Sequence, residues 1–138
     1  ADGLRELEEE LGIKADPAQL YYLGIAKEAM DKPKARNLCH TYFYETALLP
    51  HDYRPQESEV DGVFEMKITD GLKLFSGETD TAEIEGVLRT NGAYAPLKRT
   101  ISKADMAGAH ERCVLTSYYL KIMILADLYL KGHRPLVI

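Results

Sequence analysis

The chain has 138 residues and a formal net charge of −5, with 46% hydrophobic and 28% charged residues. This length favours a single domain, and this composition is typical of a soluble globular protein. No run rich in Lys and Arg is present, so the sequence lacks the basic footprint of a nucleic-acid-binding protein.

The cysteines and the most apolar stretch exclude two further classes. Cys39 and Cys113 form neither a metal-binding spacing nor a C-x-x-C pair, so we expect reduced thiols in a cytoplasmic protein. Residues 113–130 are apolar but are interrupted by Lys121 and Asp127. They therefore predict a buried helix and not a membrane span.

The first segment, ADGLRELEEELGI, predicts a helix that ends at Gly12, because glycine commonly follows the last helical turn. At about 100° per residue, three leucines fall within about 60° of one another and are expected to face the core. Three glutamates fall within about 100° of one another, roughly on the opposite side. The leucines are Leu4, Leu7 and Leu11, and the glutamates are Glu6, Glu9 and Glu10.

The three glutamates allow two interpretations. Residues three or four apart on a helix are neighbours, and like charges there repel each other unless a cation lies between them. A hard divalent cation such as Mg²⁺ prefers oxygen ligands of this kind. The alternative is a solvated acidic face near a helix start, where the helix dipole favours glutamate, and for an arbitrary acidic run this is the commoner case.

A family resemblance changes this balance. Residues 5–13, RELEEELGI, resemble the second half of the Nudix box: Arg, Glu, aliphatic, any residue, Glu, Glu, any residue, Gly, aliphatic. Every specified position is matched. The first half of the box carries a glycine and a glutamate further upstream, and only four residues precede Arg5. We therefore expect the chain to be the C-terminal part of a longer Nudix protein, and to be nearly inactive alone.

The resemblance implies roles for the residues of this segment. Glu9 and Glu10 would be the main ligands of a divalent metal, Mg²⁺ or Mn²⁺, and Glu6 a further ligand or a contact to its water. Arg5 would position the carboxylates through a salt bridge. Glu8 occupies the unspecified position and is expected to face solvent.

A base that takes a proton from the attacking water is expected from Glu6 itself or from the loop PHDYRPQESE, because many Nudix enzymes draw such a base or an extra ligand from a loop here. The loop candidates are Glu57 and Glu59. Ordinary solvation of a loop is the equally weighted alternative for both side chains.

The remaining elements are predicted from residue pattern. Strands are expected near residues 20–27, 38–48 and 60–68, and a short helix over 69–77 begins with a threonine cap and ends at Gly77. Residues 79–109 are mixed, and we expect helical turns near 82–88 and a loop around 90–96.

The clearest helix covers about residues 111–131 and is ended by Gly132. It is apolar over more than one stripe, so part of it is expected to pack against another subunit, as in a homodimer. The expected buried face consists of Val114, Tyr118, Leu125 and Leu128, with Lys121 pointing outward.

The fold that the resemblance implies is α+β: a Nudix α/β/α sandwich with a mixed sheet, lacking its N-terminal strands. Residues 1–138 would be the C-terminal part of a single Nudix domain. The phrases DGLRELEEELGI, YRPQESEVDGVFEM, LKLFSGETDTAEIEG and YYLKIMILADLYLKG are similar to bacterial Nudix hydrolases related to isopentenyl-diphosphate isomerase.

The implied function is Mg²⁺-dependent hydrolysis of a diphosphate linkage in a nucleoside diphosphate-linked or similar small molecule. Two alternatives remain open at this point. The first is isomerisation of an isoprenoid diphosphate on the same scaffold, which the intact visible half of the box disfavours. The second is a non-catalytic binding module that keeps the fold. No nucleic acid and no membrane is expected as a partner.

Overall fold

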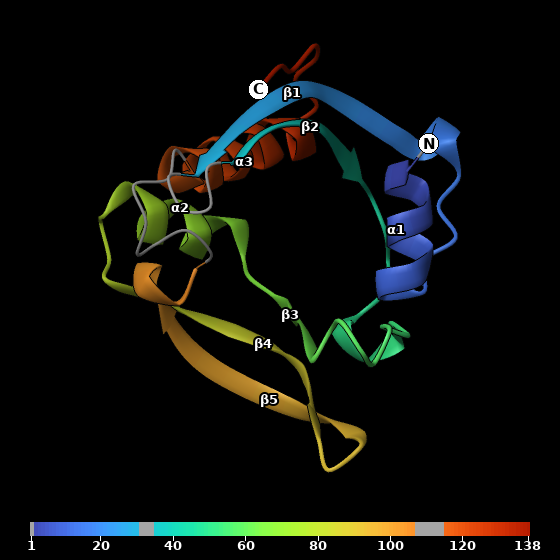
Figure 1. Cartoon of the computed structure of the whole chain (residues 1–138). Helices are drawn as coiled ribbons and strands as arrows, with labels where there is room; N and C mark the ends of the chain where they lie inside the picture. Colours follow the sequence, from blue (N-terminus) through green and yellow to red (C-terminus); the bar gives the residue numbers. More distant parts are fainter. Residues whose placement is uncertain (1, 31–34, 107–114) are drawn as a thin grey trace. The chain divides into compact units, whose positions relative to one another are not determined.

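The computed structural model describes residues 2–30, 35–106 and 115–138, and the architecture is α+β, as predicted (Figure 1). The helices are α1 (Asp2–Leu11), α2 (Ile68–Ser76) and α3 (Leu115–Leu130). The strands are β1 (Leu20–Met30), β2 (Ala35–Tyr44), β3 (Gly62–Glu65), β4 (Thr81–Thr90) and β5 (Ala93–Ser102). Short 3-10 turns η1, η2 and η3 cover Pro17–Gln19, Pro50–Asp52 and Lys103–Asp105.

The chain divides into two compact units, which are described separately. The first unit consists of residues 1–21, 44–65 and 84–99. The second unit consists of residues 22–43, 66–83 and 100–138. The organisation as part of one Nudix domain stays a prediction.

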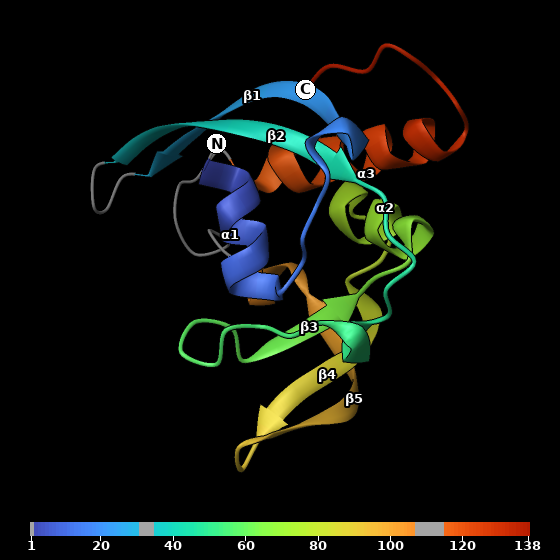
Figure 2. The ribbon, with the colours of Figure 1, turned by 90° about the vertical axis from the view of Figure 1, so that its right-hand side faces the viewer.

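The described strands form two sheets. One pairs β1 with β2, which run side by side in Figure 2, and the other has the order β3-β4-β5. Strands β3 and β4 are antiparallel, with Gly62 opposite Leu88 and Glu65 opposite Glu85. The predicted mixed sheet and three-layer sandwich stay predictions.

The helical turns predicted near 82–88 were wrong, because these residues belong to β4. The loop expected around 90–96 is reduced to a two-residue turn between β4 and β5, which form a hairpin. Asn91 and Gly92 connect the two strands, with φ of 54° and 80°. An Asn-Gly pair is the preferred centre of a two-residue hairpin turn, because both positions need positive φ. The sequence interpretation overlooked this Asn-Gly signal and therefore did not predict the hairpin.

Smaller differences concern element ends. The strand predicted near 38–48 ends at Tyr44. The helix predicted over 69–77 begins at Ile68 and is preceded by Lys67, with no side-chain cap from a threonine. Its stop at Gly77 is confirmed, since this residue has φ of 86° and its N–H bonds to the carbonyls of Leu74 and Lys73.

In the second unit, α2 packs against α3. Leu74 is completely buried, and the ring of Phe75 stacks on Tyr119 at 5.2 Å between centroids. A methyl group at Gly71 would lie 2.8 Å from the sulfur of Met123, so the two helices approach closely here. Apolar packing therefore holds this helix pair together.

The last helix is present as predicted where it is described, but its expected buried face is only half-buried. Residues 115–130 are helical, while residues 111–114, including the predicted core residue Val114, lie outside the described residues. Lys121 is exposed, as predicted, and Tyr118, Leu125 and Leu128 are half-buried. The homodimer stays a prediction. None of the described helices is long and apolar enough to cross a membrane.

Candidate functional site

The acidic helix α1 carries an arginine that binds two of its glutamates. Arg5 donates from Nη2 to Oε1 of Glu6 at 2.7 Å and from Nη1 to Oε2 of Glu9 at 2.8 Å. The Glu6 and Glu9 side chains are 45% and 48% exposed. The side chain of Glu10 is half-buried. The structure therefore brings Arg5, Glu6 and Glu9 together.

The leucine side of the helix is less buried than expected. Leu4, Leu7 and Leu11 are half-buried, and the buried residue of this region is Ile13, which follows the helix. The N–H groups of Gly12 and Ile13 close the helix by bonding to the carbonyls of Glu8 and Leu7.

The end of α1 is joined to the segment that follows η2. The Arg54 N–H donates to the carbonyl of Leu11 at 3.2 Å, and the Gln56 N–H donates to the carbonyl of Glu10 at 3.1 Å. Gly12 has φ of 69°, and a Cβ there would lie 2.8 Å from the Arg54 carbonyl oxygen. Glycine is required on both grounds, because it tolerates positive φ and leaves room for the close backbone approach.

Arg54 also orders its own segment. Its Nη1 lies 3.2, 3.1 and 2.9 Å from the carbonyl oxygens of His51, Asp52 and Tyr53. One guanidinium group thus satisfies three consecutive carbonyls that would otherwise need water. The segment from the η2 turn to Gln56 is held in one conformation against the last turn of α1.

The acidic loop begins directly after this junction, since Glu57 follows Gln56. Arg89 of β4 donates from Nη1 to Oε2 of Glu57 at 3.2 Å and from Nη2 to Oδ1 of Asp61 at 3.1 Å. The hydrogen bond to Asp61, the largest cause, raises the pKa of Arg89. The backbone N–H of Arg89 also donates to the Asp61 carbonyl at 2.7 Å. Both ends of the loop are therefore held by one residue of the sheet.

The two predicted base candidates differ in their surroundings. The carboxylate of Glu57 is held by Arg89. Glu59 is exposed, and within the described ranges its carboxylate makes no hydrogen bond or ion pair, although its N–H donates to the Gln56 carbonyl. The sequence interpretation missed Arg54, Arg89 and Asp61 as residues that order this region.

Comparison with known proteins decides the family. The chain is 34% identical over 107 residues to an uncharacterized Nudix hydrolase of Clostridium acetobutylicum, and the match covers 75% of this chain and 52% of the relative. The chain belongs to the Nudix hydrolase superfamily. It spans about half the length of this Nudix relative. No family model matches the chain, and no solved structure gives a significant match.

The assignment of the box residues to the first helix stays a prediction. Among the described residues, no group of three or more His, Cys, Asp or Glu side chains is arranged to hold a metal ion. The convergence of Glu6, Glu9 and Glu10 on one ion thus stays a prediction. The donor set itself fits, because it consists of carboxylate oxygens, the hard ligands that Mg²⁺ and Mn²⁺ prefer. Both carboxylates held by Arg5 are about half exposed, so a change of rotamer would free them toward solvent.

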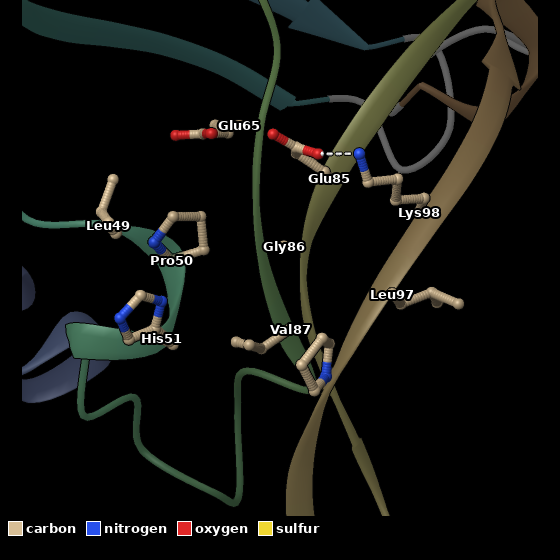
Figure 3. A pocket seen from close by; sticks show the side chains of 10 residues that line it. Leu49, Pro50, His51, Glu65, Glu85, Gly86, Val87, Leu97 and Lys98 are labelled. Atoms are coloured by element: carbon tan, nitrogen blue, oxygen red, sulfur yellow. Dashed lines mark ion pairs between the residues drawn. The ribbon is translucent and has the colours of Figure 1, made fainter.

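A cavity of about 420 Å³ lies in the same unit, and Figure 3 shows it from close by. Residues of the η2 region, β3, β4 and β5 line it: Leu49, Pro50, His51, Glu65, Glu85, Gly86, Val87, Pro96, Leu97 and Lys98. The segment that the Arg54 guanidinium orders thus contributes His51 to this cavity and ends at the last turn of α1.

Proposed function

We propose that the protein hydrolyses a diphosphate linkage in a nucleoside diphosphate-linked or similar small molecule, with a divalent metal ion as cofactor. The observation that carries the proposal is the backbone bond from Gln56 to Glu10. It joins the acidic loop of residues 57–61 to the helix that bears the box glutamates. The carboxylates that we propose for metal binding and for proton transfer thus belong to two segments that share a backbone hydrogen bond.

The roles follow from charge and contacts. Glu9 and Glu10, with Glu6, would hold Mg²⁺ or Mn²⁺, which when bound neutralises the diphosphate oxygens and makes a bound water more acidic. Arg5 orients Glu6 and Glu9 through its two short hydrogen bonds. Of the loop candidates, we assign proton acceptance to Glu59, because Arg89 already binds the carboxylate of Glu57. Glu57 would instead keep the loop in place.

Hydrolysis is preferred to isomerisation because each box carboxylate that the chain covers is present. The relative from Clostridium acetobutylicum bears the name Nudix hydrolase, which agrees with this choice.

The test measures turnover of a panel of diphosphate compounds in the presence of Mg²⁺. It compares the parent with three variants: Glu9→Gln, Glu10→Gln and Glu8→Gln. The first two changes should abolish most activity, because each removes a charged ligand while keeping the side-chain shape. Glu8 is the matched control: it lies on the same helix, carries the same charge and pairs with Lys14 at 3.3 Å. Equal damage from Glu8→Gln and Glu9→Gln would refute the metal assignment.

Thermal melting gives a second readout that needs no substrate. A metal ion that binds only the folded protein stabilises it by about 2.7 kcal/mol at a hundredfold excess over its dissociation constant. Mg²⁺ should therefore raise the melting temperature of the parent and of Glu8→Gln, and raise that of Glu9→Gln and Glu10→Gln less. If all four proteins respond equally, the acids form a solvated face.

A further inference from the structure

The cavity in the first unit has the size of a small-molecule site. Its volume of about 420 Å³ lies within the range of about 300–1,000 Å³ that is usual for ligand pockets. Its lining combines apolar side chains with a few charged ones, which is also usual for such sites. The charged groups lie together at one end, where Figure 3 shows Glu65, Glu85 and Lys98 in a row.

The order of this row follows from strand register. Glu65 of β3 lies directly opposite Glu85 of β4, so the two carboxylates project from the same face of the sheet. Like charges directly opposite each other in an antiparallel pair destabilise it. Lys98 of β5 compensates one of them, with its Nζ 2.6 Å from Oε2 of Glu85.

Glu65 lacks such compensation. In the parts of the chain that the structure describes, its carboxylate makes no hydrogen bond or ion pair, and it is exposed to the cavity. Two carboxylates and one ammonium group, those of Glu65, Glu85 and Lys98, leave this row of lining residues with an excess of one negative charge. A cation placed beside Glu65 and Glu85 would relieve their repulsion.

The rest of the lining is mostly apolar. Away from the charged row, Figure 3 shows Leu49, Pro50 and Val87, with His51 beside Pro50, and half of the Leu49 surface is exposed. Val87 is buried beside the close approach of β3 to β4. A ligand body that covers these side chains would remove apolar surface from water, which favours binding.

We propose that this cavity binds a small organic amine, whose ammonium group lies beside Glu65 and Glu85 and whose apolar body covers Leu49 and Pro50. An anionic group is disfavoured there by the excess negative charge. The apolar side chains beside the two carboxylates favour an ammonium group with an apolar body over a bare metal ion. The site goes beyond the proposed diphosphate hydrolysis and does not depend on it, since none of its lining residues belongs to the helix with the box glutamates.

The experiment compares 2-phenylethylamine with its neutral counterpart 2-phenylethanol by titration calorimetry at neutral pH. The two probes share an apolar body and differ in the charged group. The amine should bind about tenfold more tightly than the alcohol, as expected for hydrogen bonds to a charged partner. Equal affinity for the two probes, or no saturable binding of the amine at millimolar concentration, would overturn the proposal.

Two isosteric variants locate the site. Glu65→Gln keeps the side-chain shape and should remove most of the preference for the amine over the alcohol. Glu78→Gln removes the same charge at an exposed position outside the cavity and should leave that preference unchanged. If Glu65→Gln binds the amine as the parent does, the ammonium group lies elsewhere and the proposal is wrong. Because no turnover is measured, the result is independent of the proposed hydrolysis.

Discussion

Different kinds of contact predominate inside each of the two units. Among the described residues of the first unit, ion pairs are frequent: Arg5 with Glu6 and Glu9, Lys14 with Glu8, Arg89 with Glu57 and Asp61, and Lys98 with Glu85. The second unit instead contains most of the buried apolar side chains, among them Leu23, Leu74, Phe75, Ala82, Ile101 and Leu136.

The ion pairs of the first unit and the apolar core of the second unit have different roles. Exposed ion pairs contribute little to folding, commonly about 0–1 kcal/mol, so those of the first unit serve mainly to orient side chains. Backbone hydrogen bonds and close backbone approaches connect the segments of the first unit to one another. In the second unit, burial of apolar surface supplies most of the stability. Substitutions in the two units should therefore have different consequences.

The largest effect is expected from Leu74→Ala in the second unit. Leu74 is fully buried, so the change removes apolar contacts and leaves a cavity, at a cost of about 2–5 kcal/mol. Leu130→Ala is the control, because Leu130 is 66% exposed and its truncation should change stability by less than about 0.5 kcal/mol. Urea denaturation measures both. A similar loss for the two variants would contradict the assignment of the core.

Gly86→Ala tests the backbone approach in the first unit. A Cβ at this position would overlap the Val63 carbonyl oxygen and lie 2.7 Å from Cα of Phe64, and backbone atoms cannot move aside easily. We expect a loss of about 1–3 kcal/mol in urea denaturation, as for other overpacked sites.

Gly3→Ala is the matched control for that change. Nothing lies within 4 Å of a Cβ at Gly3, which is part of α1. Alanine is favoured over glycine inside a helix by up to about 1 kcal/mol, so this variant should be slightly more stable than the parent. If both changes destabilise the protein to a similar extent, a steric clash at Gly86 is not the cause of the stability loss in Gly86→Ala.

These positions also show what the sequence could and could not predict. The helix of residues 2–11, the stop at Gly77 and the apolar last helix were predictable, because their signals are local. The hairpin of β4 and β5 was missed although its Asn-Gly turn is a local signal. Gly86 interrupts the β pattern of β4, and glycine stands there because a Cβ would meet the Val63 carbonyl of β3. The partners of Arg89 lie 32 and 28 residues away, so no local pattern could reveal them.

The third prediction concerns the ion pairs of Arg89. Replacement by Gln removes the contacts to Glu57 and Asp61, so the loop of residues 57–61 should open more often. Hydrogen exchange should become faster at the N–H groups of Glu59 and Val60, which bond to the Gln56 carbonyl. The effect on global stability should be small, since the carboxylate partners are exposed.

A double-mutant cycle sharpens this prediction. The Arg89→Gln and Glu57→Gln changes should be non-additive in hydrogen exchange, because they remove the same contact. Arg89→Gln and Glu59→Gln should be additive, because Glu59 makes no ion pair within the described chain. Coupling of Arg89 to Glu59 instead of Glu57 would reverse the roles that we assign to the two glutamates.

The smallest effect is expected from Tyr53, which lies in the ordered segment between the cavity and the box helix. Burial raises its pKa above the ordinary value of 10.0, and the charges of Glu65 and of an ionised Tyr44 raise it further. Its ionised form is therefore less favourable in the folded state than in the unfolded state. The associated stability is present below about pH 10 and is lost as the pH rises through the folded-state pKa, because the unfolded protein releases this proton first.

Two variants separate the causes of this shift. Tyr53→Phe should show a smaller loss of unfolding free energy between about pH 9 and pH 11 than the parent, because it has no proton to release. Glu65→Gln should reduce the loss only in part, since burial is the larger cause and remains. Urea denaturation measures the unfolding free energy of the three proteins across this pH range. The difference between each variant and the parent isolates Tyr53 from the other groups that titrate there. If Tyr53→Phe loses stability as steeply as the parent, the phenol is not disfavoured by its surroundings. If Glu65→Gln removes the whole effect, the carboxylate and not burial controls Tyr53, and this edge of the cavity carries a stronger negative field than its one excess charge implies.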